Sequence, residues 1–151
     1  MHPDLSPLTS QGRLRAISVK PYVPGKDETL GEANLAEVIV FSYGEGRAYR
    51  VLYDPATRRI LRRDQLPGRP QPSQEEVNET LDLIRSDPEH AKLLSSGNVL
   101  EGGFAVDGPP DSPLRDRFVQ IQMLSPDRKN FVRIITVDLT ANKIVESVPK
   151  Q

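Results

Sequence analysis

The stretch that decides the fold is LPGRPQPSQEEVNETLDLIRSDPEH, residues 66–90. It begins with three prolines among its first seven residues. Proline cannot donate to a sheet ladder, so a strand that reaches this point must end here. Ser73 and Glu76 then form the S-x-x-E pattern of a capping box, which predicts the start of a helix. A stiff connection therefore separates two parts of the chain, and a capped helix opens the second part.

The apolar residues of this helix follow at helical spacing. Val77, Leu81 and Ile84 should therefore face one way. Asp87 and Pro88 interrupt the pattern, but Asp at an N-cap followed by Pro at the first helical position is also how a helix begins. A second, short helix is expected directly after the first.

Runs rich in β-branched and aromatic residues on both sides of the helices predict strands joined by short turns. Before the helices, the expected strands are 13–19, 36–43, 47–53 and 59–66. After them, the expected strands are 98–106, 117–124, 131–139 and 143–148. The predicted fold class is α+β: a curved antiparallel sheet packed on one main helix, as in cystatin-like units. The helix residues Val77, Leu81 and Ile84 should pack on strand residues such as Ile121, Ile135 and Val137.

The order of these elements predicts the domain organisation. Residues 1–12 are polar and contain proline, so we expect a flexible arm. Residues 13–66 form the β-meander of a partial first α+β unit, and residues 67–151 form a second unit with a helix, a short helix and four strands. A single domain in which both parts pack together is the alternative.

Two segments of the chain echo one another. YDPATRRIL (53–61) and VDLTANKIV (137–145) align without a gap, and each contains an aspartate, Asp54 or Asp138, six residues before an isoleucine. In each hairpin the aspartate side chain can hold the turn by accepting from backbone amides two residues on. The echo predicts one and a half repeated units, and two unrelated hairpins with the same turn chemistry remain the alternative.

Composition excludes several classes of function. Lys plus Arg number 20 against 21 Asp plus Glu, so the net charge of -1 supplies no field that would attract nucleic acid. Four arginines gather at positions 58, 59, 62 and 63, which we interpret as a solvated strand edge that resists aggregation. The chain has no cysteine and no apolar run of about 20 residues, so we expect neither disulfides nor a membrane span. It shows no signal peptide, and as written the protein is expected to be cytoplasmic.

No candidate for catalysis or metal binding survives inspection of the sequence. His90 lies beside an acid on a predicted helix and is expected at the surface, and His2 lies in the arm. Glu75 and Glu76 are adjacent and suit the first turn of a helix. Serines and threonines have no evident base beside them. Three further acids could gather around a cation, but their spacing does not follow the EF-hand pattern: Glu101, Asp107 and Asp111. We therefore predict no catalytic, cofactor-binding or metal-ligating residue and no cofactor.

The order of these segments resembles a known family. RAYRVLYDPATRRILRRDQLPGRPQPSQEEVNETLDLIRSDPEHAKLL (47–94) resembles the junction between the two small α+β domains that precede the catalytic domain in copper amine oxidases. VLEGGFAVDGP (99–109), RFVQIQML (117–124) and VRIITVDLTANKIVES (132–147) are similar to the strands that follow. The resemblance covers about residues 36–148.

The same resemblance shows which catalytic residues are missing. Copper amine oxidases make topaquinone from the tyrosine of T-x-x-N-Y-[DE] and bind copper through three histidines. This chain has no Asn-Tyr pair and only His2 and His90, so none of the family's catalytic residues can be assigned to it. The resemblance implies a non-catalytic accessory or interaction protein, such as a small subunit of an amine (tyramine) oxidase system.

The expected partner is another protein, either a catalytic amine oxidase chain or a second copy, with no nucleic acid and no membrane. The alternative is a stand-alone module that binds a small ligand between helix and sheet. Protease inhibition by a cystatin-like wedge ranks last, because the chain lacks a Q-x-V-x-G loop.

Overall fold

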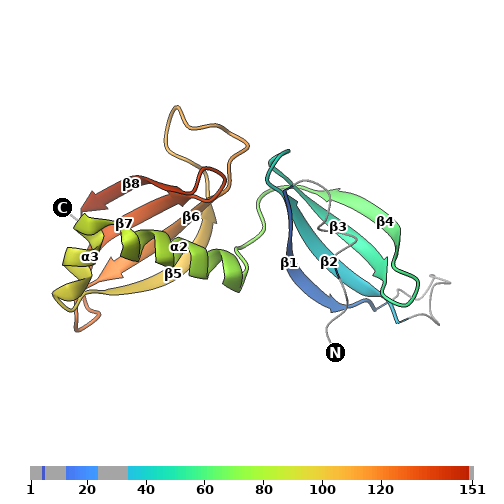
Figure 1. Cartoon of the computed structure of the whole chain (residues 1–151), viewed down its shortest axis with the longest axis horizontal. Helices are drawn as coiled ribbons and strands as arrows, with labels where there is room; N and C mark the ends of the chain where they lie inside the picture. The colour runs from blue at the N-terminus through green and yellow to red at the C-terminus, as the bar shows by residue number, and fades with distance from the viewer. Residues whose placement is uncertain (1–4, 6–12, 24–33, 150–151) are drawn as a thin grey trace. The chain divides into compact units, whose positions relative to one another are not determined.

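A computed structural model describes residue 5 and residues 13–23 and 34–149. The chain divides into two compact units, residues 1–69 and 70–151, and the boundary falls within the proline-rich connection. Each unit contains a four-stranded antiparallel sheet whose strands follow one another in sequence order (Figure 1). The second unit adds helices, so the α+β class is confirmed.

The first unit is a β-meander. Its strands are β1 (Leu14–Pro21), β2 (Ala36–Ser42), β3 (Arg47–Asp54) and β4 (Arg59–Leu66). Alternate residues of β2 and β3 point to one face and form its core: Ala36, Val38, Val40, Val51 and Tyr53. The predicted arm lies outside the described residues except for Leu5, which packs against this core.

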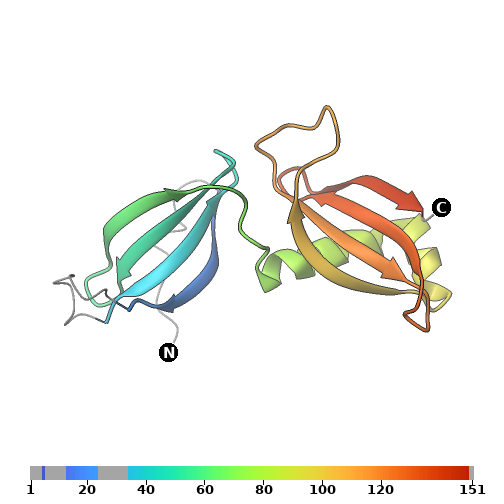
Figure 2. The ribbon, with the colours of Figure 1, turned by 180° about the vertical axis from the view of Figure 1, so that it is seen from behind.

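The second unit places helices against one face of its sheet. Its elements are α2 (Gln74–Ser86), α3 (Pro88–Ser95), β5 (Val99–Val106), β6 (Phe118–Leu124), β7 (Phe131–Asp138) and β8 (Lys143–Pro149). Figure 1 shows α2 lying across the sheet, and Figure 2 shows from behind the face that neither helix covers. The fully buried side chains of β6 and β7 include Ile121, Ile135 and Val137.

Both helices start as the sequence predicts. Ser73 Oγ accepts from Glu76 N, and Glu76 Oε1 accepts from Ser73 N, which completes the capping box. Asp87 caps α3 by accepting from His90 N over 3.2 Å, and Pro88 occupies the first turn. The described part of the chain contains no helix that is both long and apolar enough to cross a membrane.

The buried face of α2 differs from the predicted one. Ile84 is fully buried, but the other fully buried residues of the helix are Glu76 and Thr80, while Val77 and Leu81 are half-buried. The apolar spacing predicts a buried face that starts at Val77, whereas the observed face starts one residue earlier, at Glu76. The difference arises because an acid is expected to face solvent. The hydroxyl of Thr80 is satisfied inside the unit, because Oγ1 donates to the Glu76 carbonyl oxygen over 2.8 Å.

A glycine pair in β5 lets α2 come close to the sheet. Gly102 and Gly103 both have positive φ, and they lie where the pairing of β5 with β6 shifts register. A Cβ atom added to Gly103 would stand 2.9 Å from Val77 Cγ2. Val77 therefore packs directly on the strand backbone, which explains why β5 needs glycine at this point.

The echoed segments form two hairpins of the same geometry. In β3–β4 the register shifts between Leu52 and Tyr53, and in β7–β8 it shifts between the equivalent Thr136 and Val137. The fourth residue after each aspartate has positive φ, 57° at Arg58 and 55° at Asn142. The agreement extends beyond turn chemistry to a bulge at the same place, which favours the repeat over two unrelated hairpins.

The two turn aspartates act as predicted, with a small difference. Asp54 Oδ1 accepts from the amide of Ala56, two residues on, over 3.0 Å. Asp138 Oδ1 accepts from the amide of Ala141, three residues on, over the same distance. Asp138 is also buried, whereas Asp54 is half-buried.

Candidate functional site

A buried ion pair holds the start of α2. Arg117 Nε and Nη2 each donate to one carboxylate oxygen of Glu76 over 2.9 Å, and Arg117 Nη1 donates to the Pro70 carbonyl oxygen over 2.8 Å. Both side chains are fully buried. Glu76 also accepts from Ser73 N, so the carboxylate accepts three hydrogen bonds from these groups. The pair joins the connection, the helix and the start of β6, and it is structural.

This ion pair corrects the sequence-based interpretation of Glu75 and Glu76. Glu75 is exposed, as an acid in a first helical turn usually is. Glu76 instead points into the unit, because Arg117 lies opposite with donors in a bidentate arrangement. The partners are 41 residues apart in sequence, so local pattern could not reveal the contact.

His90 is likewise buried, and the prediction of a surface histidine is wrong. Its side chain is 3% exposed. Nδ1 lies 2.5 Å from Asp87 Oδ2, and Nε2 lies 2.8 Å from Ser147 Oγ on β8. Arg133 Nη1 donates to the same Ser147 oxygen over 3.0 Å, and Arg133 Nη2 pairs with Glu89 at 3.0 Å. Sequence reasoning missed this cluster because α3 packs on strands that follow much later in the chain.

The Asp87–His90–Ser147 line has the order of a nucleophile triad, so the expectation that no serine has a base nearby is also wrong. Such a triad needs a hydroxyl that reaches substrate and donors aimed at the developing oxyanion. Here the imidazole is almost fully buried, and Ser147 Oγ already accepts from Arg133. We therefore interpret the line as a tie between α3 and the edge strand β8. The hydrogen bond from the His90 side chain is the main cause that lowers the pKa of Asp87.

The three further acids do not come together as a cation site. Glu101 pairs with Arg128, and Asp111 lies in the loop after β5 with φ of 69°. In the described residues, no three acidic or histidine side chains are grouped so that they could hold a metal ion.

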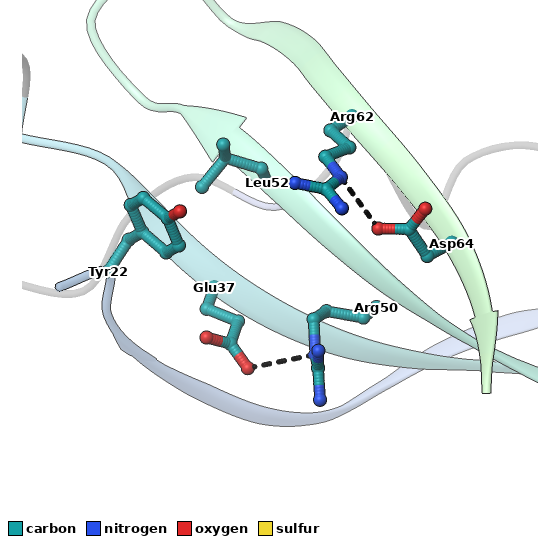
Figure 3. A pocket seen from close by; sticks show the side chains of 6 residues that line it. All are labelled: Tyr22, Glu37, Arg50, Leu52, Arg62 and Asp64. Carbon is teal, nitrogen blue, oxygen red and sulfur yellow. Dashed lines mark ion pairs between the residues drawn. The ribbon is translucent and has the colours of Figure 1, made fainter. Parts of the chain in front are cut away.

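A shallow hollow of about 210 Å³ lies on the face of the first sheet opposite its core. Leu52 forms its floor, and two ion pairs flank it: Glu37 with Arg50 at 3.2 Å, and Arg62 with Asp64 at 2.8 Å (Figure 3). These residues come from two adjacent cross-strand rows of β2, β3 and β4. Tyr22 stands at one side. The alternative of a small-ligand module expected its cavity between helix and sheet, whereas the hollow around Leu52 lies elsewhere. A wide, open hollow of about 580 Å³ does lie between the helices and the start of β5, lined by residues of α2, α3 and β5.

The edge strand β4 is the most exposed strand of the first unit. Its only neighbour in the described sheet is β3. The first five residues, Arg59 to Arg63, are all exposed, and the apolar Ile60 and Leu61 among them are 48% and 47% exposed. Arginines on an edge strand protect it from aggregation, and exposed aliphatic side chains on it are typical of surfaces that bind a partner. The composition of β4 is consistent with both roles.

Comparisons with known proteins give one kind of match. No family model and no curated protein matches the chain. Several solved structures do. One of them is the crystal structure of a copper-containing benzylamine oxidase from Hansenula polymorpha, with a TM-score of 0.59 over 93% of this chain and 14% sequence identity. The match spans 26% of the length of that oxidase, so this chain shares the fold of part of it.

Proposed function

We propose that the protein is a non-catalytic accessory or interaction protein that works beside a catalytic amine oxidase chain, as a small subunit of an amine or tyramine oxidase system would. The observation that carries the proposal is the fold similarity, which takes in 93% of this chain but about a quarter of a copper-containing benzylamine oxidase. The cystatin-like assignment of the individual units stays a prediction.

Exposed apolar side chains on the second sheet support a protein partner. Phe104, Ile134 and Val148 are 47%, 40% and 45% exposed. Ile134 on β7 and Val148 on β8 are register partners. Their neighbours Ile135 and Ser147 point the other way, since Ile135 is fully buried and Ser147 contacts His90 of α3. The pair therefore lies on the sheet face that the helices leave uncovered, which is the face seen in Figure 2. Large apolar residues on the uncovered face of a sheet are typical of interaction surfaces.

The polar groups buried in the second unit support a non-catalytic role. Glu76, Arg117 and His90 are each engaged in hydrogen bonds that join one element to another. The residues of this chain also lack the T-x-x-N-Y-[DE] pattern and a third histidine. In this proposal, copper, quinone and amine oxidation therefore belong to the partner chain.

Affinity capture tests the proposal. The tagged chain is expressed in its source cells, and the eluate is assayed for an amine oxidase chain by mass spectrometry and for peroxide released from tyramine or benzylamine. We expect both in the eluate of the parent chain and a reduced yield with Ile134→Lys. An eluate without an amine oxidase chain, or a purified chain that itself oxidises an amine, contradicts the proposal.

The hollow on the first sheet favours a second candidate function, binding of a small zwitterion. It presents carboxylates and guanidinium groups around an apolar floor, which suits a molecule with both charges. At about 210 Å³ it is smaller than the roughly 300 to 1,000 Å³ of most ligand pockets, so we rank this function second. Glycine titrated into the labelled protein should shift the NMR signals of Arg50 and Asp64, and unchanged signals at saturating glycine would exclude this ligand.

A further inference from the structure

We propose that β4 is a docking edge, to which an acidic, extended segment of a partner protein adds as a further strand. The inference rests on the proposed accessory function and names a strand edge that would meet the partner in addition to the exposed apolar face of the second sheet. It is carried by the backbone geometry of β4, by its charge, and by the contrast with β8.

The backbone supplies the first part of the argument. In the described sheet β4 pairs with β3 on one side, and its other side is an edge of the meander. An edge strand presents backbone donors and acceptors that a peptide strand can pair with. The bulge opposite Leu52 and Tyr53 interrupts regular pairing near Leu61, which leaves Arg62 to Leu66 as the regular segment.

Charge supplies the second part. Strand β4 carries three arginines and one aspartate, and Arg58 in the preceding turn adds a fourth arginine. Its counterpart in the repeat, β8, carries one lysine and one glutamate. The two hairpins share their bulge and turn geometry, so this difference is not required by the fold. A basic edge attracts an acidic strand and repels a basic one.

Two of the arginines are already held in place. Arg62 pairs with Asp64 at 2.8 Å, and the guanidinium carbon of Arg63 lies 3.9 Å from the ring centroid of Tyr49. A guanidinium group that is already positioned loses less conformational freedom when it binds a carboxylate. Arg62 and Arg63 are adjacent, so they point to opposite faces of the sheet. An added strand could therefore place acidic side chains next to a positioned guanidinium group on either face.

The same observations weigh against other occupants. A second copy joined through β4 would bring arginines against arginines, which is unfavourable. Nucleic acid would find four arginines on a chain whose net charge is -1 and would leave the edge backbone unpaired. An acidic peptide strand satisfies both the backbone and the charge.

Fluorescence anisotropy with two labelled peptides tests the inference on the full chain. The first peptide alternates Glu and Val over eight residues, the length of β4, and the second replaces Glu with Lys. We expect the acidic peptide to bind, the basic peptide not to bind, and affinity to fall as salt is raised. An acidic peptide with alternate N-methylated amides should not bind, because it cannot pair with a strand edge.

Charge-reversal variants test whether the acidic peptide binds at β4. Arg59→Glu combined with Arg62→Glu exchanges attraction for repulsion, so binding should weaken by about tenfold or more. The matched control is Lys143→Glu, because Lys143 occupies the position of Arg59 in the second hairpin. The control should change affinity by less than about twofold. Circular dichroism of each variant checks that the fold is intact.

Several outcomes overturn the inference. These are equal binding of the N-methylated peptide, equal weakening by Lys143→Glu, a single-stranded DNA that displaces the peptide at matched concentration, or dimerisation through β4 in size-exclusion chromatography. If the charge-reversed double variant still captures an amine oxidase chain from cells, then β4 is the wrong surface while the accessory function stands. If no oxidase is captured but the peptide binds β4, the accessory function fails and the docking edge remains.

Discussion

The β3–β4 and β7–β8 hairpins are built alike but are used differently. Val51 faces Arg63 in the first, and Ile135 faces Ser147 at the equivalent place in the second. Ser147 is bound by His90 of α3, so its strand is tied to a helix. Arg63 stacks on Tyr49 within its own sheet, and its strand stays exposed. One architecture therefore gives a strand tied to helices in one copy and an accessible, basic strand in the other.

The comparison shows what covering a sheet with helices requires. In the second unit, polar contacts hold both ends of an apolar helix–sheet interface: Glu76 with Arg117 at one end, and His90 with Ser147 at the other. The position in the first unit that corresponds to Arg117 is Asn34, which is exposed. The described part of the first unit thus lacks the residues that would make the same ties.

The largest expected effect is loss of the buried pair. Arg117→Met leaves the Glu76 carboxylate buried without its guanidinium partner, which should destabilise the second unit by about 3 to 5 kcal/mol. All four tyrosines lie in the first unit, while the described helices lie in the second. Denaturant unfolding followed by circular dichroism at the helix band should therefore shift, and tyrosine fluorescence should not.

The control for this variant uses the equivalent position of the first unit. Asn34→Ala removes an exposed side chain and should change stability by less than about 0.5 kcal/mol. The double variant Glu76→Leu with Arg117→Met should recover much of the loss, because both charges are removed together. A double variant as unstable as Arg117→Met alone would show that the pair is not what holds the helix.

A smaller effect is expected from the hydrogen-bonded line at α3. Ser147→Ala leaves His90 Nε2 and Arg133 Nη1 each without one partner, which should cost about 1 to 3 kcal/mol. The counterpart, Arg63→Met, removes a cation–π contact and should cost about 0.5 to 1 kcal/mol in the first unit. Thermal unfolding with the same two probes measures both, and a larger loss for Arg63→Met would reverse our comparison.

The turn aspartates should differ in the same direction. Asp138→Ala removes a buried acceptor and should cost about 1 to 2 kcal/mol, whereas Asp54→Ala removes a more exposed one and should cost about half as much. Equal losses of unfolding free energy in the two variants would indicate that the burial of Asp138 adds nothing to stability. Urea unfolding of the two single variants is the measurement.

The smallest expected effect is the change in stability of the second unit at acidic pH. The His90 hydrogen bonds lower the pKa of Asp87 below its ordinary value of 3.8, so deprotonated Asp87 stabilises the folded second unit. That contribution is complete above the ordinary value and is lost as the pH falls through the lower, folded-state pKa. Because the side chain is 37% exposed, we expect less than about 1 kcal/mol. Asp87→Asn keeps the helix cap and should flatten this part of the stability curve, and an unchanged acid limb would contradict the assignment.

Local pattern was enough to predict the elements. Alternating β-branched residues and short turns marked the strands, and Ser73 with Glu76 marked the start of α2, because each of these signals acts within a few residues. The aspartates of the echoed hairpins were found in the same way. The similarity to part of an amine oxidase also agrees with the order of segments that suggested it.

Contacts between distant residues were beyond prediction. Glu76 has a cap role that is visible in sequence, but its burial depends on Arg117, which comes after a long loop. His90 likewise needs Ser147, 57 residues later, to be satisfied inside the unit. A charged residue directly before an apolar strand, as Arg117 stands before β6, is a weak signal for such a partner. The hollow around Leu52 needs the register of several strands, which sequence does not supply.

Hydrogen–deuterium exchange of the complex captured from source cells tests the central claim most directly. The amides of β4, residues 59–66, should become strongly protected in the complex, because they pair with the partner strand. The amides of β8, residues 143–149, should gain much less protection, because the partner meets this strand only through side chains such as Val148. Protection of β8 with no change in β4, or no protected segment in the first unit, would contradict the account.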